Sequence, residues 1–211
     1  MGNQEQEVKT TQESYNNFAD QYATLWGENW QQEDSLLVNK FLSSVKPGGT
    51  ILDVGCGTGH ILAYMEQQGF DVIGVDTSDG MLAEAANRIE VSKLFHMDAQ
   101  QLQFPDNTFD GLISRFVLQH IQGDIAQPFG EFYRVVRNGS LLYVVAHVSN
   151  TEEPQETWYE LPNGGKIKMF YRDPETVGVA AKQSGFRIET QNLTQDEGCR
   201  NLFMLLRKEI I

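Results

Sequence analysis

The stretch that decides the fold is residues 51–59, which read Ile51-Leu52-Asp53-Val54-Gly55-Cys56-Gly57-Thr58-Gly59. A short strand that carries an acid runs into three alternating glycines, and a helical pattern follows. Glycine lets a backbone approach a ligand closely, because it has no Cβ and permits positive φ. The pattern predicts a ligand-binding turn contacted at Asp53, Gly55, Cys56, Gly57 and Gly59. A tight turn without any ligand is the alternative.

The spacing of the glycines distinguishes two kinds of ligand. A dinucleotide site expects G-x-G-x-x-G, but the position of the third glycine in that pattern holds His60. This departure favours S-adenosylmethionine (SAM), whose amino-acid end needs close backbone contact and brings no pyrophosphate. An NAD-dependent oxidoreductase is the rival enzyme class.

Outward from this turn, short apolar runs alternate with helical patterns. Strands are predicted at 51–54, 72–75, 93–97, 109–114 and 141–146, and helices at 61–67, 81–89 and 124–136. The runs are continuously apolar, which fits strands covered on both faces, and their alternation with helices implies parallel pairing. We therefore predict an α/β fold, a doubly wound, mostly parallel sheet in a single domain.

Further elements are predicted on both sides of this alternation. In chain order they are a disordered tail (1–13), a cap of two helices (14–46), a lid insertion folded as a hairpin (148–172), a helix (173–185) and two closing strands (186–190 and 201–207). Aromatic residues at helical spacing predict the first cap helix. The turn Pro162-Asn163-Gly164-Gly165 predicts the hairpin, and Asp173 followed by proline predicts the helix start.

Acids at the ends of the second and third strands complete the predicted cofactor site. Asp76 is placed to accept hydrogen bonds from ribose hydroxyls, with Thr77 beside it. Asp98, next to Ala99, is placed to accept from the adenine amine, and Met81 to contact the ring. The alternatives are that Asp76 caps the following helix and that the methionine is core filler.

These motifs, together with 104–110, resemble the successive motifs of class I SAM-dependent methyltransferases over residues 50–145. The resemblance implies a Rossmann-like seven-stranded sheet of order 3-2-1-4-5-7-6 with an antiparallel seventh strand. Residues 15–22 are similar to the helix that covers the cofactor in the small-molecule branch, which includes ubiquinone and menaquinone biosynthesis enzymes. That similarity implies that Tyr15 or Tyr22 faces SAM; packing in the core is the alternative.

Candidate acceptor contacts lie at later strand ends and in the insertion. His120 and His147 are candidate general bases, because strand carboxyl ends form the ligand crevice in such sheets. Packed or capping histidines are the alternative. Tyr171 and Trp158 of the insertion, with Arg115, are predicted substrate contacts; the alternative is a hairpin that buries its own aromatics. No residue cluster has metal-ligand spacing, so no metal is predicted.

Composition limits the partners. The 211 residues carry a formal net charge of −13, which would repel nucleic acid. The polar N-terminus and the lack of long apolar runs predict a cytoplasmic protein without a membrane span, and two cysteines imply no disulfide framework. We expect a monomer or homodimer that methylates an O, N or C atom of a small molecule. A catalytically silent SAM-binding protein, or a methyltransferase acting on protein or tRNA, is the alternative.

Overall fold

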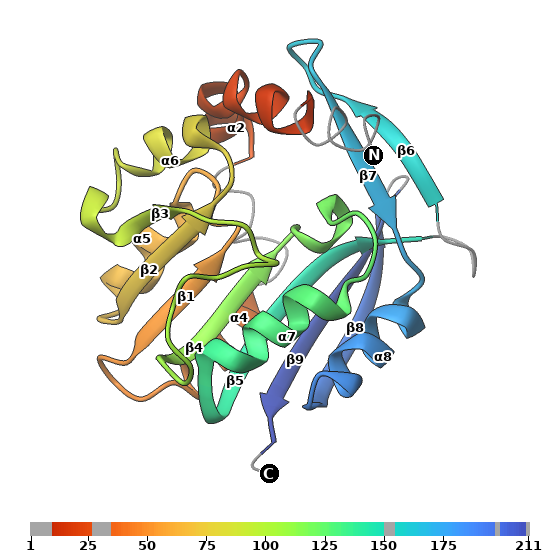
Figure 1. The fold of residues 1–211 in the computed structure, drawn as a ribbon. Helices are drawn as coiled ribbons and strands as arrows, with labels where there is room; N and C mark the ends of the chain where they lie inside the picture. The colour runs from red at the N-terminus through yellow and green to blue at the C-terminus, as the bar shows by residue number, and fades with distance from the viewer. Residues whose placement is uncertain (1–9, 27–34, 150–154, 197–198, 210–211) are drawn as a thin grey trace.

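A seven-stranded sheet forms the centre of the protein in the computed structural model, which describes residues 10–26, 35–149, 155–196 and 199–209 (Figure 1). The strand order is β3-β2-β1-β4-β5-β9-β8, and β9 runs antiparallel to both of its neighbours. The strands are β1 (Thr50–Val54), β2 (Asp71–Asp76), β3 (Leu94–His96), β4 (Phe109–Arg115), β5 (Val136–Val148), β8 (Phe186–Asp196) and β9 (Cys199–Lys208). The predicted sheet order is thereby confirmed, with β9 as the antiparallel strand.

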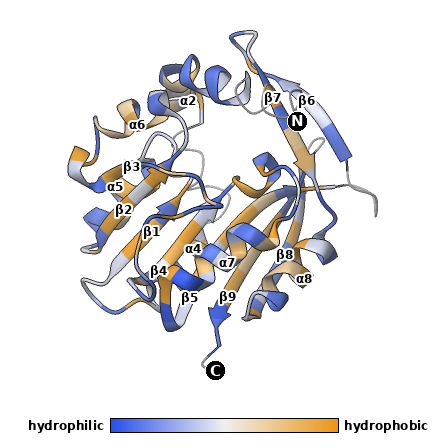
Figure 2. Cartoon of the chain, viewed as in Figure 1, coloured by the Kyte–Doolittle hydropathy of each residue, from blue (hydrophilic) through white to orange (hydrophobic). Residues whose placement is uncertain are grey.

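Helices cover both faces of this sheet because its strands are apolar on both sides. They are α2 (Ala19–Leu25), α4 (Ser35–Leu42), α5 (His60–Gln67), α6 (Asp79–Ala85), α7 (Ala126–Val135) and α8 (Pro174–Gln183), with 3-10 turns η1 (Val91–Lys93) and η2 (Leu118–His120). Alternate residues of β5 divide between two buried clusters: Leu142 and Val144 pack with the side chains of α7 and α8, and Tyr143 and Val145 with those of α4 and α5. Figure 2 shows the hydrophobic character of these central strands.

The predicted elements match the observed ones in order and type, but most strands are longer than predicted and most helices are shorter. The predicted strand at 186–190 continues through β8, because its whole length pairs with β9. The cap predicted at Asp173 is present, since its side chain accepts from the Thr176 N–H. The predicted disordered tail is wrong for residues 10–13, which are helical and contact the hairpin; residues 1–9 lie outside the described part of the chain.

The hairpin of β6 (Gln155–Glu160) and β7 (Lys166–Tyr171) and the N-terminal helices form a roof above the carboxyl ends of the parallel strands (Figure 1). Its small apolar cluster, separate from the sheet clusters, centres on Phe18, Leu161, Ile167 and Met169. The Ser14 hydroxyl donates to the Lys166 carbonyl oxygen at 2.7 Å and accepts from the same residue's N–H. Side chains of the N-terminal helix thus satisfy the free edge of β7.

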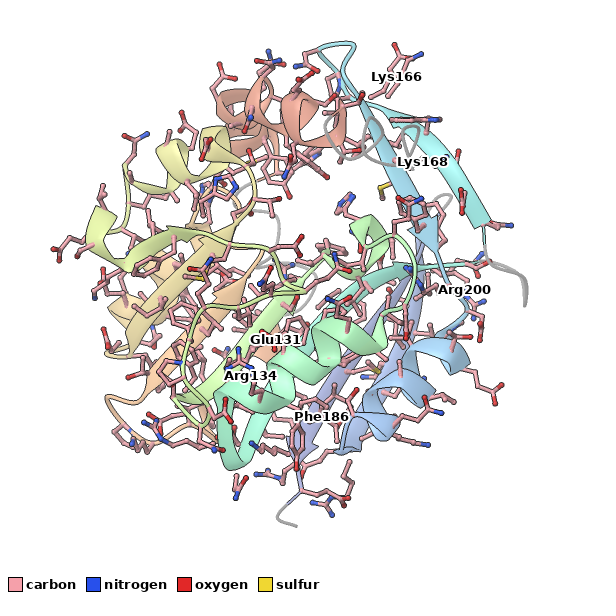
Figure 3. The ribbon with its side chains drawn as sticks, in the orientation of Figure 1. Glu131, Arg134, Lys166, Lys168, Phe186 and Arg200 are labelled. Atoms are coloured by element: carbon pink, nitrogen blue, oxygen red, sulfur yellow. The ribbon has the colours of Figure 1, made fainter. Side chains whose placement is uncertain are left out.

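An ionic pair on α7 anchors the loop that follows β3. Arg134 donates to the carbonyl oxygens of Leu102 and Phe104, and Glu131 accepts from the Leu102 N–H at 2.7 Å. Figure 3 shows Glu131 and Arg134 beside each other on this helix. No helix in the described ranges is long and apolar enough to cross a membrane.

Two glycines test how tightly the sheet is packed. A Cβ at Gly74 on β2 would lie 2.5 Å from Leu62 Cδ1 and 2.9 Å from Cys56 Sγ, whereas one at Gly130 on α7 meets nothing within 4 Å. We expect Gly74→Ala to lower the free energy of unfolding by about 1–3 kcal/mol through overpacking. Gly130→Ala, the same chemical change in a helix, should raise it by about 0.5–1 kcal/mol. Urea unfolding measures both, and an equal effect of the two changes would contradict the packing described for β2.

Candidate functional site

A cavity of about 870 Å³ lies between the roof and the carboxyl ends of the strands. Most of the residues predicted from the sequence line it: Tyr15, Tyr22, Asp53, Gly55, Cys56, Gly57, Asp76, Thr77, Met81, Asp98, Ala99, Arg115, His120, His147 and Tyr171. The lining does not include Gly59 and Trp158. One cavity therefore joins the predicted cofactor residues to the predicted acceptor residues.

The three glycines of the turn after β1 have different roles. All have positive φ, at 75° for Gly55, 51° for Gly57 and 78° for Gly59. A Cβ at Gly57 would meet nothing within 4 Å, so only this position offers open space toward a ligand. A Cβ at Gly59 would lie 3.0 Å from Ala85 Cβ on α6, which makes Gly59 a packing residue and not a cavity contact.

Asp53 presents a buried carboxylate to the cavity. The residue is 4% exposed, and no hydrogen bond to its side chain is formed within the described residues. Burial raises its pKa to about 7, the nearby Arg115 guanidinium acts in the opposite direction, and Asp76 raises it further. A cationic group of a ligand would relieve this unfavourable burial.

Asp76 braces the glycine turn. Its carboxylate accepts from the Gly57 N–H through Oδ2 and from the Ser78 N–H through Oδ1, each at 2.9 Å. Burial raises its pKa, and these backbone donors oppose the rise. The N-cap residue of α6 is Ser78, whose hydroxyl accepts from the Met81 N–H, and Asp76 accepts from the N–H of this N-cap residue. Each carboxylate oxygen keeps capacity for a further donor.

The end of the cavity near β3 is lined by residues predicted to surround a planar ring. Met81 and Ala99 are buried, whereas Asp98 is exposed and accepts from the Gln100 N–H at 2.8 Å. Thr77, which follows Asp76, also lines the cavity. Cys56 also lines the cavity, but its side chain belongs to the sheet cluster, and burial raises the pKa of its thiol well above the usual range.

At the opposite end, Tyr15 and His120 form a hydrogen-bonded pair. The Tyr15 hydroxyl lies 3.1 Å from His120 Nε2, and the two rings meet edge to face. His120 Nδ1 faces the Lys168 carbonyl oxygen at 3.5 Å, so both ring nitrogens are occupied. Burial lowers the pKa of His120 to about 4 and raises that of Tyr15 well above its usual range. The pair is therefore uncharged at neutral pH.

His147 lies at the end of β5 with a different set of contacts. Its Nδ1 lies 2.7 Å from Asn201 Oδ1, and its ring stacks at 4.6 Å on Phe116. Burial lowers its pKa, and the Asn201 bond opposes that shift. Nε2 forms no hydrogen bond to the described residues.

The hairpin contributes Tyr171 to the cavity but directs Trp158 elsewhere. Successive strand residues point to opposite sides, and on β6 it is Tyr159 that lines the cavity. Trp158 is 41% exposed and packs against Lys168, whose Nζ lies 5.4 Å from the indole centroid. Trp158, which was predicted as a substrate contact, is therefore not part of the lining of this cavity.

Sequence reasoning did not identify Arg172, which holds the loop carrying His120. Its guanidinium donates to the carbonyl oxygens of Leu118, Phe170, Ile121 and Gly123. It also did not identify Phe116, whose φ of 56° is unusual for a bulky residue, at the end of β4. Neither the hydrogen bonds of Arg172 nor the positive φ of Phe116 is marked by a local motif in the sequence. Within the described residues, no group of three or more His, Cys, Asp or Glu could hold a metal ion.

Comparisons with known proteins show what the central segment is similar to. Residues 52–144 match the family model for the methyltransferase domain. Phosphoethanolamine N-methyltransferase 2 of Caenorhabditis elegans is 27% identical over 186 residues, which cover 83% of this chain and 42% of that protein. Demethylmenaquinone methyltransferase of Symbiobacterium thermophilum is 38% identical over 104 residues, which cover 44% of this chain and 41% of that protein. The chain spans about two fifths of the length of either relative.

The fold is shared with solved structures. A SAM-dependent methyltransferase from Methanosarcina mazei superposes with a TM-score of 0.72 at 18% identity, covering 83% of this chain and 98% of that one. The Rossmann-like methyltransferase fold predicted from the sequence is confirmed. Together with the domain match, this confirms the predicted resemblance to SAM-dependent methyltransferases.

The raised pKa of Asp53 predicts how stability depends on pH. Between about pH 4 and pH 7 the folded state keeps the Asp53 proton, whereas the unfolded chain has released it. The contribution of Asp53 is therefore most favourable below pH 4 and is lost as pH rises toward 7. We expect Asp53→Asn to remove this loss, so that the variant gains about 1–4 kcal/mol relative to wild type between pH 4 and pH 7 in urea unfolding.

Asp110 provides a control with the opposite sign. Burial raises its pKa, but the Thr50 N–H and the cations of Lys46 and Arg137 outweigh burial and lower it. Asp110→Asn should therefore cost stability above pH 4, and this cost should shrink as pH falls below that value. Parallel pH profiles for wild type and Asp53→Asn would refute the raised pKa of Asp53.

Proposed function

We propose that this chain is a SAM-dependent methyltransferase that transfers a methyl group from SAM to a small-molecule acceptor. The observation that carries the proposal is the pairing of an open backbone position at Gly57 with the unpartnered, buried carboxylate of Asp53. The amino-acid end of SAM, which carries an ammonium group, matches the open space at Gly57 in shape and the Asp53 carboxylate in charge.

The other cofactor residues support the same orientation. Asp76 retains acceptor capacity for ribose hydroxyls at the end of β2, and Asp98 lies where an adenine amine would reach. Met81 and Ala99 give the ring an apolar surface. Tyr15 and Tyr22 lie on the roof side of the same cavity, as the resemblance to cofactor-covering helices implies.

SAM supplies a methyl group on a sulfonium, which is already a good leaving group. The protein therefore has mainly to align the acceptor and exclude water, and alignment can supply roughly 7–11 kcal/mol of barrier lowering. The roof can serve this purpose, because Tyr171 and Tyr159 of the hairpin line the cavity. A base is needed when the acceptor arrives protonated, and His120 and His147 are the candidates in the lining.

The size of the cavity and the named relatives support a small-molecule acceptor. The named relatives are methyltransferases for phosphoethanolamine and demethylmenaquinone, both small molecules. We propose an acceptor of this size class that contacts Arg115 and Tyr171. We also propose that the protein is cytoplasmic and is a monomer or a homodimer. The net charge of −13 disfavours nucleic acid as a substrate. A screen of such acceptors for release of S-adenosylhomocysteine tests the activity, and SAM binding without turnover would favour a silent binding protein.

The cofactor assignment predicts different effects at two similar glycines. Gly57 and Gly48 both have positive φ, and a Cβ at either meets nothing within 4 Å, but only Gly57 lines the cavity. Alanine at either position should therefore cause similar backbone strain, about 1–2 kcal/mol. We expect Gly57→Ala to weaken SAM binding roughly 10-fold or more by occupying ligand space, and Gly48→Ala to leave it unchanged, in calorimetric titrations. Equal affinities would remove the turn from the site.

The acceptor assignment predicts different effects at two aromatic residues of the hairpin. Tyr171→Ala removes a ring that lines the cavity, so the acceptor KM should rise roughly 10-fold or more. SAM affinity should stay close to that of wild type, because Asp53, Gly57 and Asp76 lie at the ends of β1 and β2, away from the hairpin. Trp158→Ala removes a ring outside the cavity and should change neither quantity. A parallel loss of SAM affinity in Tyr171→Ala would make the hairpin a cofactor element.

A further inference from the structure

A cross-strand pair lies at the carboxyl edge of the sheet. His147 on β5 is directly opposite Asn201 on β9 in the antiparallel register, so their side chains share one face. The preceding residues of the same row, Tyr143 and Val145, are buried against α4 and α5. His147 is the next residue in that row, and it lines the cavity.

The contact with Asn201 determines which nitrogen of His147 carries the proton. Nδ1 lies 2.7 Å from Asn201 Oδ1, and an amide oxygen can only accept. The bond therefore requires the proton on Nδ1 and leaves a lone pair on Nε2. The stacking of the ring on Phe116 at 4.6 Å further limits its rotation.

The two candidate bases differ in their free lone pairs. His120 uses Nε2 toward the Tyr15 hydroxyl and faces the Lys168 carbonyl oxygen with Nδ1, so it has no nitrogen left for an acceptor. His147 has Nε2 without a hydrogen bond to the described residues. The geometry thus indicates that His147 can take a proton, whereas His120 orients Tyr15.

We propose that Asn201 is a positioning residue that holds the proton of His147 on Nδ1, so that His147 Nε2 takes the proton that the acceptor loses. This inference rests on the proposed methyl transfer. A lone pair of the acceptor forms the new bond to the methyl carbon, and the electrons of the old carbon–sulfur bond stay on sulfur as a thioether. The acceptor's O–H or N–H proton moves to Nε2, and the resulting imidazolium returns it to water.

The surroundings keep His147 neutral before that step. Burial lowers its pKa, which the Asn201 bond opposes. The neighbouring ionisable groups are His120 on η2, which interacts electrostatically with His147, and Arg115 at the end of β4, whose guanidinium lies 5.2 Å from the centroid of the same Phe116 ring. His120 is itself neutral at neutral pH, and burial disfavours the charged form of His147, so its imidazole is available as a base.

The ligand-free protein provides a direct test. The chain has four histidines, so single His→Gln variants assign each ring in proton–nitrogen correlation spectra. We expect His147 in the Nδ1–H tautomer in wild type and a shift toward the Nε2–H tautomer in Asn201→Leu. Diethyl pyrocarbonate, which attacks a free imidazole nitrogen, should label His147 several-fold faster than His120. An Nε2–H tautomer in wild type, or faster labelling of His120, would overturn the inference.

A carboxylate in place of the amide tests the link to catalysis. Asn201→Asp should raise the pKa of His147 and move the acidic limb of kcat/KM upward by roughly one pH unit or more. His147→Gln should lower kcat at neutral pH by roughly 100-fold or more with SAM affinity retained. Asn192→Asp adds the same charge at an exposed site on β8 and should leave the profile in place. If the acidic limb of the kcat/KM profile stays at the wild-type pH in Asn201→Asp, the positioning role of Asn201 is overturned.

The two proposals fail in different ways. The acceptors used are phosphoethanolamine and demethylmenaquinone, with S-adenosylhomocysteine release as the readout. Loss of SAM binding in calorimetry, or no turnover of either compound, counts against the proposed function. The tautomer and labelling results are read on the free protein, so they decide the arrangement of Asn201 and His147 independently. Full turnover by His147→Gln overturns the inference while leaving methyl transfer intact.

Discussion

The site depends on how the end of β2 holds the backbone of the glycine turn. The N–H groups of Gly55 and Cys56 both donate to the Val75 carbonyl oxygen, and the Gly57 N–H donates to Asp76. Three successive amides are thus fixed before any ligand binds. The turn is preorganised, so a ligand that approaches Gly57 does not have to order it. Because β1 lies between β2 and β4, the same pairing brings Asp53 and Arg115 to one edge.

The roof is attached to the sheet by a different kind of contact. Its apolar cluster around Phe18 is separate from the two sheet clusters, and its links to the rest of the chain include single hydrogen bonds such as that from Ser78 Oγ to Asn16 Oδ1. Breaking a few such bonds costs far less than global unfolding. A roof of this construction can admit ligands while the sheet that carries the turn stays folded.

The sequence was sufficient to predict the fold and most of the residues that line the cavity near the glycine turn. Apolar runs alternating with helices leave few topologies open, and the glycine turn is a local motif that carries its own geometry. The acceptor half depends on partners that are distant in the chain. Asn201 is 54 residues from His147 and becomes its partner only through the register of β5 with β9. Whether Trp158 or Tyr159 lines the cavity likewise depends on the strand register, because a shift by one residue exchanges the two faces of the strand. Composition does not determine that register.

The two ends of the cavity differ in charge in a way that suits the proposed chemistry. Asp53 is buried and Asp76 partly buried near the turn, and Asp76 raises the cost of ionising Asp53. A cationic ligand removes that cost, so its binding favours release of the Asp53 proton and becomes tighter as pH rises toward 7. At the other end His120 and His147 are neutral, and a neutral imidazole accepts a proton without an ion pair to break. The anionic end is thus matched to a sulfonium with its ammonium, and the neutral end to an acceptor that must lose a proton.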